Sequence, residues 1–387
     1  MYSFDKIVER CGTNCTKWDS GNRDTIPLWI ADMDFECLPE VKEAIVKRAK
    51  HPVYGYTFAD EEVYQSIIDW QKRHHDIDIS KENIILNTGV VYSLYLLVSL
   101  FVKEDEKIIV QPPVYPPFFN IPADLGREVV FSPLIKKENE WVMDFVGFEK
   151  CLRDDKKIKM YILCNPHNPT GKCYSRQDLS KIAAICQKYN VMLVSDEIHS
   201  DIIMPNAKHT CILNCVDDFN NVVVFTAPTK TFNLAGLKIS YTITKDRKIA
   251  EIFGKQAKSS GLSSINIFAF EALKAVYKNG DEWIKECNQY IYDNFLFLKD
   301  YLQTNIPQIK FNIPEGTYLA WLDFSALNIE GDLNARLINE AKVQLNKGSG
   351  FYSICDKYQR MNVACPRTQL EQGLQRIKEW LQNNRYI

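Results

Sequence analysis

Four short polar segments of this sequence combine residue types that could bind a ligand and act on it. They are Asn87–Val91, Asn165–Gly171, Asp196–Asp201 and Thr226–Lys238. Each follows a run of β-branched and aliphatic residues that predicts a buried strand. Because ligands of parallel α/β sheets bind beyond the carboxyl ends of the strands, the four segments are candidates for a single site.

The first two segments could receive an anion and a polar ring. Gly89 and Val90 open a predicted helix, whose free backbone N–H groups and positive dipole end favour a phosphate. A plain turn between strand and helix would explain the same pattern. The second segment contains two Asn-Pro pairs and a glycine, which predict a rigid non-helical loop. Asn168 in this loop could direct its amide at a ligand.

The other two segments supply a carboxylate and an amine. Asp196 ends an apolar strand, where a carboxylate is costly unless it pairs with a cation, although it could instead cap the chain locally. His199 is of interest only for its spacing from Asp196. Lys230 lies just past the apolar run Val222–Phe225, and a lysine at the end of a sheet can have a lowered pKa and form a Schiff base. An exposed loop lysine is the plain alternative.

Taken together with Tyr115, these residues suit pyridoxal phosphate. The helix start would receive the phosphate, and the lysine would attach to the aldehyde. The carboxylate would keep the pyridine nitrogen protonated, so that the ring can take up electrons. The amide would hold the ring hydroxyl, and the tyrosine would stack on the ring.

A sheet is needed to bring these segments together, and the chain alternates short strand patterns with helical ones. The alternation predicts an α/β fold with a mostly parallel sheet covered by helices on both faces. In one helical stretch Ser175 and Asp178 form a capping box, and Asn190 stands at the C-terminal cap. The tail after about residue 285 predicts a smaller α/β unit. The strand candidates are Asn83–Leu86, Lys107–Val110, Lys159–Leu163, Val191–Ser195, Asn221–Thr226 and Ile239–Ile243. The tail candidates are helices at Trp283–Gln303, Leu333–Lys342 and Thr368–Asn383, and strands at Thr317–Phe324 and Arg360–Ala364.

The composition of the chain indicates which kinds of binding partner are not expected. The chain has 387 residues with 47 Lys and Arg against 49 Asp and Glu, so we expect no nucleic-acid partner. Its longest apolar stretch without charge, Val90–Val102, is shorter than the roughly 20 residues of a membrane span, and no signal-peptide pattern is present. Twelve scattered cysteines without a C-x-x-C pair predict reduced thiols and no metal site. We therefore expect a cytoplasmic protein.

The sequence resembles fold-type I pyridoxal-phosphate enzymes of the class I/II aminotransferase superfamily, and within it the bacterial cystathionine β-lyase (C–S lyase) branch. The resemblance implies a large cofactor-binding domain, residues 43–283, and a small domain formed by residues 1–42 and 284–387. It rests on the four segments above and on Trp29–Phe35, His51–Thr57, Gln111–Phe118, Gly316–Asp323 and Arg360–Asn362.

The resemblance also implies roles at the ring of the cofactor. Lys230 would bind the cofactor covalently and then remove the Cα proton of the substrate. Asp196 would pair with the ring nitrogen, and Asn168 would bond the ring hydroxyl. His199 stands where many aminotransferases have a tyrosine near that hydroxyl, and Tyr115 would stack on the ring.

Other residues would, by the same resemblance, bind the phosphate. The backbone of Gly89 and Val90 would donate to it, and Lys238 would replace the arginine of many relatives. Thr226 and Thr229 are weaker candidates.

The substrate and the partner subunit complete the implied site. Arg360 would bind the carboxylate of an amino acid substrate in a bidentate pair, with Ala31 nearby. Tyr56 would reach the phosphate bound by a partner subunit, which implies a homodimer with shared active sites.

Three reactions or roles remain open. β-Elimination would release a thiol, pyruvate and ammonia from a sulfur amino acid, whereas transamination would use the same residues to pass the amino group to a 2-oxo acid. A regulatory role beside catalysis is the third. The sequence departs from its relatives at Glu315, Lys347 and Tyr352, which we expect near the domain cleft.

Overall fold

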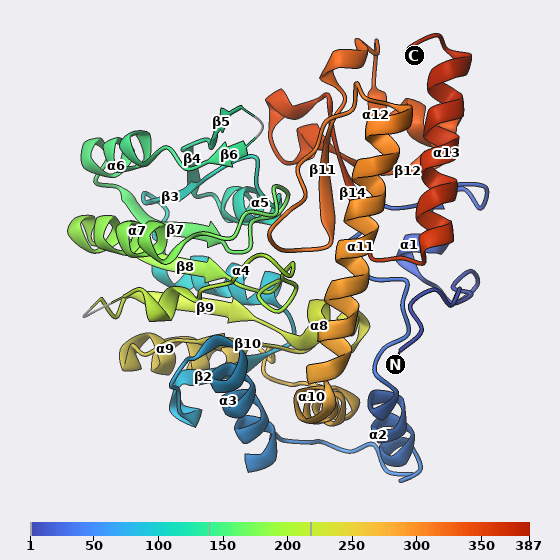
Figure 1. The fold of residues 1–387 in the computed structure, drawn as a ribbon. Coiled ribbons are helices and arrows are strands. Elements are labelled where there is room, and N and C mark those ends of the chain that lie inside the picture. The colour runs from blue at the N-terminus through green and yellow to red at the C-terminus, as the bar shows by residue number, and fades with distance from the viewer. Residues whose placement is uncertain (1, 139, 217–218) are drawn as a thin grey trace.

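The computed structural model describes residues 2–138, 140–216 and 219–387, and is built around a seven-stranded sheet of order β2-β10-β9-β8-β7-β3-β4 (Figure 1). The pairs from β4 through β9 are parallel, and β10 runs antiparallel to both of its neighbours. The mostly parallel α/β sheet predicted from the sequence is therefore confirmed. Its strands are β2 (Ile84–Asn87), β3 (Lys107–Val110), β4 (Glu128–Phe131), β7 (Ile158–Cys164), β8 (Met192–Asp196), β9 (Val222–Thr226) and β10 (Ser240–Ile243).

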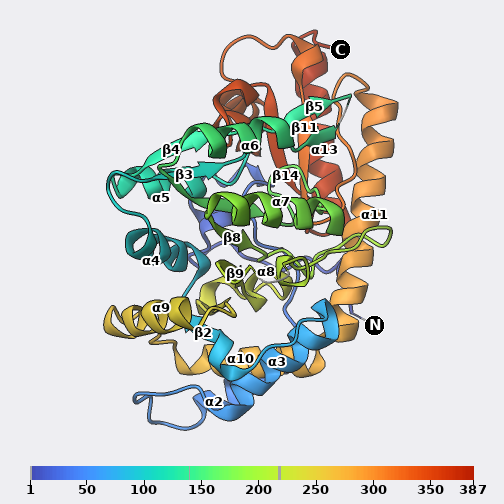
Figure 2. The ribbon, with the colours of Figure 1, turned by 90° about the vertical axis from the view of Figure 1, so that its left-hand side faces the viewer.

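Helices cover both faces of this sheet because alternate strand residues face two apolar cores. In β7, Met160 and Ile162 pack with helices α4, α5 and α9, whereas Tyr161 and Leu163 join the core that contains α6 and α7. Figures 1 and 2 show these two helical layers. The helices up to the end of this part are α1 (Thr16–Asp19), α2 (Pro39–Ala49), α3 (Glu61–His75), α4 (Val90–Phe101), α5 (Pro117–Asp124), α6 (Phe145–Asp154), α7 (Arg176–Tyr189), α8 (Pro228–Thr231), α9 (Arg247–Ser259) and α10 (Ile267–Asn279).

The C-terminal part forms a smaller sheet, in which β14 pairs antiparallel with both β11 and β13. The N-terminal strand β1 pairs in parallel with β12, so the start of the chain lies in this part (Figure 1). The division into residues 43–283 and the two chain ends stays a prediction. The elements here are β1 (Ile26–Pro27), α11 (Asp281–Asn305), β11 (Leu319–Asp323), α12 (Leu333–Arg336), β12 (Val343–Gln344), β13 (Asn346–Lys347), β14 (Tyr358–Asn362) and α13 (Arg367–Asn383).

The six strands expected in the large sheet are present, with ends that differ by a residue or so. Ser175 Oγ accepts the backbone N–H of Asp178 at 3.1 Å, and Asn190 has the left-handed conformation of a C-terminal cap. The helix expected at Leu333–Lys342 is instead a single α-turn followed by a π-helical turn, Leu337–Ala341. The sequence analysis missed β4 and the charged hairpin of β5 (Ile135–Lys137) and β6 (Glu140–Val142), which are largely exposed.

Among the described residues, no helix has the length and apolar character needed to cross a membrane. Within the same ranges, no cluster of three or more His, Cys, Asp or Glu side chains could hold a metal ion.

A buried carboxylate fixes the N-terminal loop that follows β1. Asp34, 3% exposed, pairs with Lys17 at 2.7 Å and Arg10 at 2.6 Å, and accepts the indole N–H of Trp18 at 2.9 Å. Burial alone would raise the pKa of Asp34, but the Lys17 ammonium and the donated hydrogen bonds outweigh it and hold that pKa below its usual value.

We expect Asp34→Asn to lower the free energy of unfolding by about 3–5 kcal/mol, because it removes the nearer carboxylate from the buried Lys17 ammonium and leaves only Asp32, at 3.8 Å. Urea unfolding at neutral pH measures the change. Glu36→Gln is the control, since Glu36 pairs with Lys6 on the surface and should cost under about 1 kcal/mol. Equal effects of the two substitutions would contradict the prediction.

Candidate functional site

A cavity of about 390 Å³ lies beyond the carboxyl ends of the parallel strands and collects all but two of the predicted site residues. It extends from the start of α4 to the small sheet, where Arg360 of β14 closes it. The predicted residues that line it are Ala31, Gly89, Val90, Tyr115, Asn168, Asp196, His199, Thr229, Lys230, Lys238 and Arg360.

The N-terminus of α4 forms one end of the cavity. Gly89 is the N-terminal cap, and Val90 and Val91 follow it as the first helical residues. Backbone N–H groups of a first helical turn have no partner within the helix, and the helix dipole adds positive potential there. Lys238 lies on the same cavity and adds a positive charge. This end can therefore receive an anionic group such as a phosphate.

Lys230 lies on α8, a one-turn helix that starts with Pro228 directly after β9. Its amine donates to the carbonyl of Ala31, which also accepts the hydroxyl of Tyr318 at 2.9 Å. Burial lowers the pKa of Lys230 to about 8; Asp32 opposes this shift and Arg360 adds to it. A larger fraction of this amine is therefore unprotonated near neutral pH, and an unprotonated amine can attack a carbonyl or accept a proton.

Asp196 ends β8 at the floor of the cavity. Burial raises its pKa to about 7, although the backbone N–H of Ile198, 3.1 Å from Oδ1, works against this shift. A carboxylate in this position is stabilised by a ligand that brings a positive charge or a donor.

His199 is also buried here, and burial lowers its pKa well below the usual value. Its Nδ1 has no hydrogen-bond partner among the described residues. Buried polar atoms are nearly always bonded, so this nitrogen indicates a partner that a ligand would bring.

Arg360 is a buried cation without a carboxylate partner in the described part of the chain. Its Nη1 donates to Asn168 Oδ1 at 2.9 Å, and its Nη2 donates to the carbonyl of Trp29 at 3.1 Å and to Asn346 Oδ1. Burial lowers the pKa of Arg360 to about 10, and its Nε remains unpaired among these residues. A carboxylate ligand would supply the charge that is missing.

Asp201 does not line the cavity but fixes α8, a role that the sequence did not predict. It accepts the hydroxyl of Thr231 at 2.7 Å and pairs with His75 at 2.8 Å. Both carboxylate oxygens are thus used within the core, and the residue next to Lys230 is tied to α3. The one sign of this role in the sequence was that Asp201 belongs to the same polar segment as Asp196.

Asn233 and Asn362 hold the loop that brings Ala31 to Lys230. Asn233 exchanges two hydrogen bonds of 3.0 Å with the backbone of Met33. Asn362 of β14 donates to the carbonyls on either side of Ala31, those of Ile30 at 2.8 Å and Asp32 at 2.6 Å. The loop therefore bridges the large and the small sheet.

Several residues of interest lie outside this cavity. Thr226 is buried in β9, with its hydroxyl 3.4 Å from the carbonyl of Glu197. Tyr56 is fully exposed and does not reach the cavity of its own chain. The three departures from the relatives, at Glu315, Lys347 and Tyr352, do not line the cavity. Glu315 pairs with Lys172, and Lys347 pairs with Asp332.

Eleven lining residues were not singled out from the sequence as site residues, among them Cys164, Ser240, Trp29 and Asn346. Cys164 ends β7, in register with Asp196 on the adjacent strand, and burial raises the pKa of its thiol. Ser240 begins β10, and Trp29 and Asn346 accept hydrogen bonds from Arg360. Cys164 and Ser240 had a signal in the sequence, namely their place at a strand end.

Comparison with known proteins agrees with this geometry. The model of the family "Aminotransferase class I and II" matches residues 23–377, and the chain belongs to this family. It is 37% identical to cystathionine beta-lyase PatB of Bacillus subtilis (strain 168) over 97% of this chain and 99% of the relative. It is 32% identical to cystalysin of Treponema denticola, whose structure contains pyridoxal 5'-phosphate; the match has a TM-score of 0.95 and covers 99% and 100% of the two chains.

A third relative is the PLP-bound C-S lyase of Staphylococcus hominis, 31% identical with a TM-score of 0.93 over 98% of each chain. The resemblance drawn from the sequence, both to the superfamily and to its C–S lyase branch, is confirmed.

In the ligand-free chain, we expect acetic anhydride to acetylate Lys230 half-maximally near pH 8, because burial lowers the pKa of this amine to about 8. Reactivity should rise with pH as the ammonium loses its proton. Peptide mass spectrometry after short pulses at pH 6–11 measures it, with the exposed Lys285 as internal reference. A half-maximal pH above about 10, the ordinary range for lysine, would contradict the lowered pKa.

Proposed function

We propose that this protein is a pyridoxal-phosphate-dependent lyase that breaks the Cβ–S bond of sulfur amino acids and releases a thiol, pyruvate and ammonia. The observation that carries the proposal is the meeting of Lys230, Asp196, Arg360 and the start of α4 in one cavity. The similarity to cystathionine beta-lyase PatB supports the choice of reaction.

The unpaired groups of the cavity fit this cofactor. The start of α4, with Lys238, would hold the phosphate. Asp196 would pair with the protonated ring nitrogen, and the buried Nδ1 of His199 lacks a partner that the ring hydroxyl could provide.

Asn168 is oriented for the same hydroxyl. Its Oδ1 already accepts from Arg360, so its NH₂ group is the end available to a ligand in the cavity. Tyr115 lies on the cavity wall, where its ring would stack on the cofactor, and Lys230 would hold the cofactor through its amine.

When bound, the cofactor withdraws electrons from Cα of the amino acid, which makes loss of the Cα proton easier. Arg360 would hold the substrate carboxylate, and so fix Cα near Lys230. The lowered pKa of Lys230 leaves its amine able to accept the Cα proton at neutral pH. The hydrogen bond from Lys230 to Ala31 gives the free amine a fixed position in the cavity.

Transamination is the alternative, because the same residues serve both reactions up to loss of the Cα proton. The names of two similar proteins favour elimination, since PatB is a cystathionine beta-lyase and the Staphylococcus hominis enzyme is a C-S lyase. A thiolate is also a good leaving group from Cβ, so a sulfur amino acid held by Arg360 needs no second substrate.

We expect the holoenzyme to convert L-cystathionine to pyruvate, ammonia and a thiol without any added 2-oxo acid. Arg360→Ala should raise KM by about 10²-fold, because it removes a charged, bidentate contact to the carboxylate. Coupled assays for pyruvate and thiol measure both, and Arg153→Ala, which removes a surface arginine, is the control. If no pyruvate forms and the amino group passes to an added 2-oxo acid, the aminotransferase alternative replaces the lyase.

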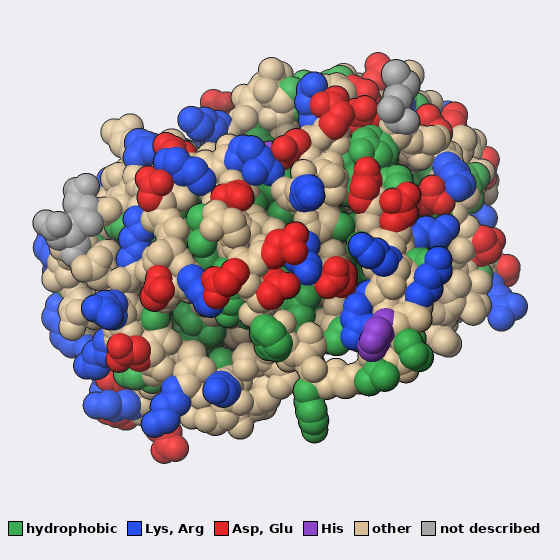
Figure 3. Space-filling view, turned by 90° about the horizontal axis from the view of Figure 1, so that it is seen from below, with side chains coloured by type: hydrophobic (Ala, Val, Ile, Leu, Met, Phe, Trp, Pro, Cys, Tyr) green, Lys and Arg blue, Asp and Glu red, His purple; other side chains and the backbone are tan. Residues whose placement is uncertain are grey.

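We further propose a homodimer with shared active sites. An exposed apolar segment supports it: Val53, Tyr54, Tyr56 and Phe58 are 61%, 59%, 113% and 81% exposed. Large contiguous apolar patches on a surface mark sites of association. Figure 3 shows the face seen from the side of α2 and α10, where apolar side chains project beside a hollow. That hollow is lined by Tyr54, Tyr56, Phe58, Ile267 and Phe268, among others.

A second exposed apolar group lies next to the cavity. Val91, Tyr92 and Tyr95 of α4 are 41%, 52% and 50% exposed, and the first two line the cavity itself. A partner subunit whose segment around Tyr56 covers this end would bury both apolar groups and place Tyr56 near the phosphate.

Mixing and refolding Lys230→Ala with Tyr56→Ala should restore activity to about a quarter of the wild-type value, since half of the randomly formed dimers have one intact site of two. Each variant alone should be nearly inactive. Activity of the refolded mixture measures the restoration, and Lys230→Ala mixed with itself is the control. An active monomer in solution scattering would rule out the shared site.

A cytoplasmic location is part of the proposal. The twelve cysteines are free, most of them buried, and free thiols are typical of a reducing compartment.

A further inference from the structure

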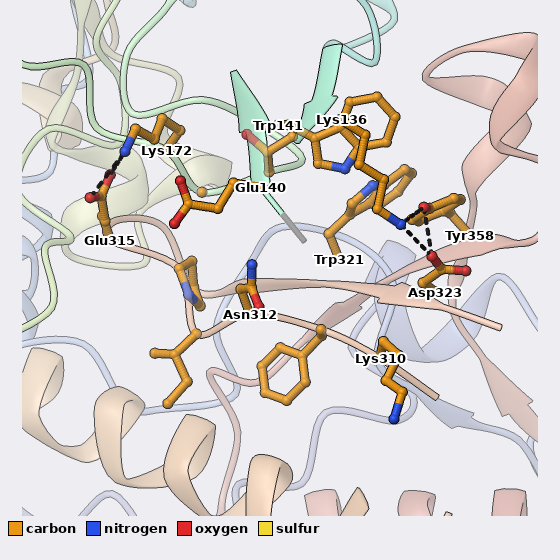
Figure 4. Close-up of a pocket in the computed structure, with 15 residues that line it drawn as sticks. Lys136, Glu140, Trp141, Lys172, Lys310, Asn312, Glu315, Trp321, Asp323 and Tyr358 are labelled. Carbon is orange, nitrogen blue, oxygen red and sulfur yellow. Dashed lines mark hydrogen bonds and ion pairs between the residues drawn. The ribbon is translucent and has the colours of Figure 1, made fainter. Parts of the chain in front are cut away.

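A second pocket, of about 110 Å³, lies beside the Lys230 cavity. We call it the hairpin pocket, because the hairpin β5–β6 forms one wall; Thr170–Lys172, Lys310–Glu315 and the faces of β11 and β14 form the others (Figure 4). Within the described ranges, it has no lining residue in common with the Lys230 cavity. No step of the proposed reaction uses it.

Three aromatic side chains form one side of the hairpin pocket. Trp321 and Tyr358 are stacked at 5.2 Å with 18° between their planes, and Trp141 meets Tyr358 edge-on at 6.0 Å. Trp321 is 7% exposed, and its Nε1 has no hydrogen-bond partner among residues 2–138, 140–216 and 219–387. Because a buried N–H is nearly always bonded, this donor requires an acceptor from outside the described chain.

The charged side chains of the hairpin pocket are mostly paired with one another. Lys136 contacts Asp323 at 2.8 Å and the hydroxyl of Tyr358 at 2.7 Å. Lys172 contacts Glu315 at 3.3 Å. Figure 4 shows these two pairs on opposite sides of the pocket, and the side chain of Lys310 directed away from both. The paired groups therefore leave little net charge.

Glu140 and Lys310 are the exceptions, since neither forms an ion pair within the described residues. Figure 4 shows the side chain of Lys310 directed away from both pairs, and the carboxylate of Glu140 on the same side as the Lys172–Glu315 pair. The pocket thus combines one carboxylate without a cation and one indole N–H without an acceptor, on opposite sides.

We propose that the hairpin pocket is a second binding site, for a small zwitterionic amino acid whose ammonium pairs with Glu140 and whose carboxylate accepts from Trp321 Nε1. A simple anion would be repelled by Glu140, and a simple cation would leave the indole N–H unpaired. The volume of the pocket, about 110 Å³, limits the ligand to a short side chain.

The site is connected to the Lys230 cavity through two shared segments. Gly171 lines the hairpin pocket, and its carbonyl accepts the N–H groups of Glu315 and Gly316, both at 2.9 Å. Three residues earlier, Asn168 contacts Arg360. Trp321 is itself the register partner of Arg360 across β11 and β14. Binding would therefore act on the residues that hold the substrate carboxylate; this consequence, unlike the binding itself, rests on the proposed function.

Nuclear magnetic resonance of the holoenzyme with ¹⁵N-labelled tryptophan tests the site. The chain has seven tryptophans, and the indole N–H signal of Trp321 is identified by its absence in Trp321→Phe. L-Alanine, which has no leaving group at Cβ, is the probe. We expect it to shift the Trp321 signal in a saturable way, and Glu140→Gln to weaken the apparent affinity about tenfold or more.

The control variant is Arg360→Ala, which disables carboxylate binding in the Lys230 cavity but should leave the Trp321 shift in place. Acetate and ethylammonium, each with half of the ligand's charges, should shift the signal far less than L-alanine. The proposal is overturned if L-alanine causes no shift, if the shift persists unchanged in Glu140→Gln, if Arg360→Ala abolishes it, or if acetate alone matches L-alanine. Since none of these readouts is an activity, failure of the lyase assay would not affect them.

Discussion

The free-energy cost of burying charged side chains is the main physical constraint on the Lys230 cavity. Lys230, Asp196 and Arg360 lie together in one cavity, and burial shifts the pKa of each in the direction that favours the neutral form. It lowers the pKa of Lys230 to about 8, raises that of Asp196 to about 7 and lowers that of Arg360 to about 10. None of the three is neutralised by a close ion pair in the described structure. A protein maintains such a cavity only when its fold supplies compensation elsewhere. A ligand with an aldehyde, a ring cation and a carboxylate would complement Lys230, Asp196 and Arg360 in turn.

That compensation is found in the surrounding hydrogen bonds. Asp201 fixes the turn that carries Lys230, and Asn168 and Asn346 fix the guanidinium of Arg360. The loop around Ala31 is tied to both sheets and presents its carbonyl to the lysine. The contacts join positions up to 332 residues apart in the sequence, so the site exists only when both sheets are folded and in place.

The sequence was sufficient to predict the residues at strand ends. Lys230, Asp196 and Asn168 follow strands whose apolar runs are easy to recognise, and polar residues at that edge of a parallel sheet point to a site. It was insufficient for Asp201 and Asn233, which do not line the Lys230 cavity and act through contacts with distant segments. Thr226, expected as the last residue of its strand, does end β9, but it does not line the Lys230 cavity, and its hydroxyl lies 3.4 Å from the carbonyl of Glu197. The hairpin β5–β6 was missed because its short, charged strands have no buried face to impose a pattern.

The burial of one lining residue, Cys164, determines how reactive the wall of the cavity is. The reaction proposed here frees a thiol in the cavity that Cys164 lines. Thiol–disulfide exchange and oxidation both proceed through the thiolate, and burial keeps Cys164 protonated by raising its pKa. The protonated sulfur of Cys164 therefore fills the space beside Asp196 without offering a thiolate that could attack a disulfide or be readily oxidised.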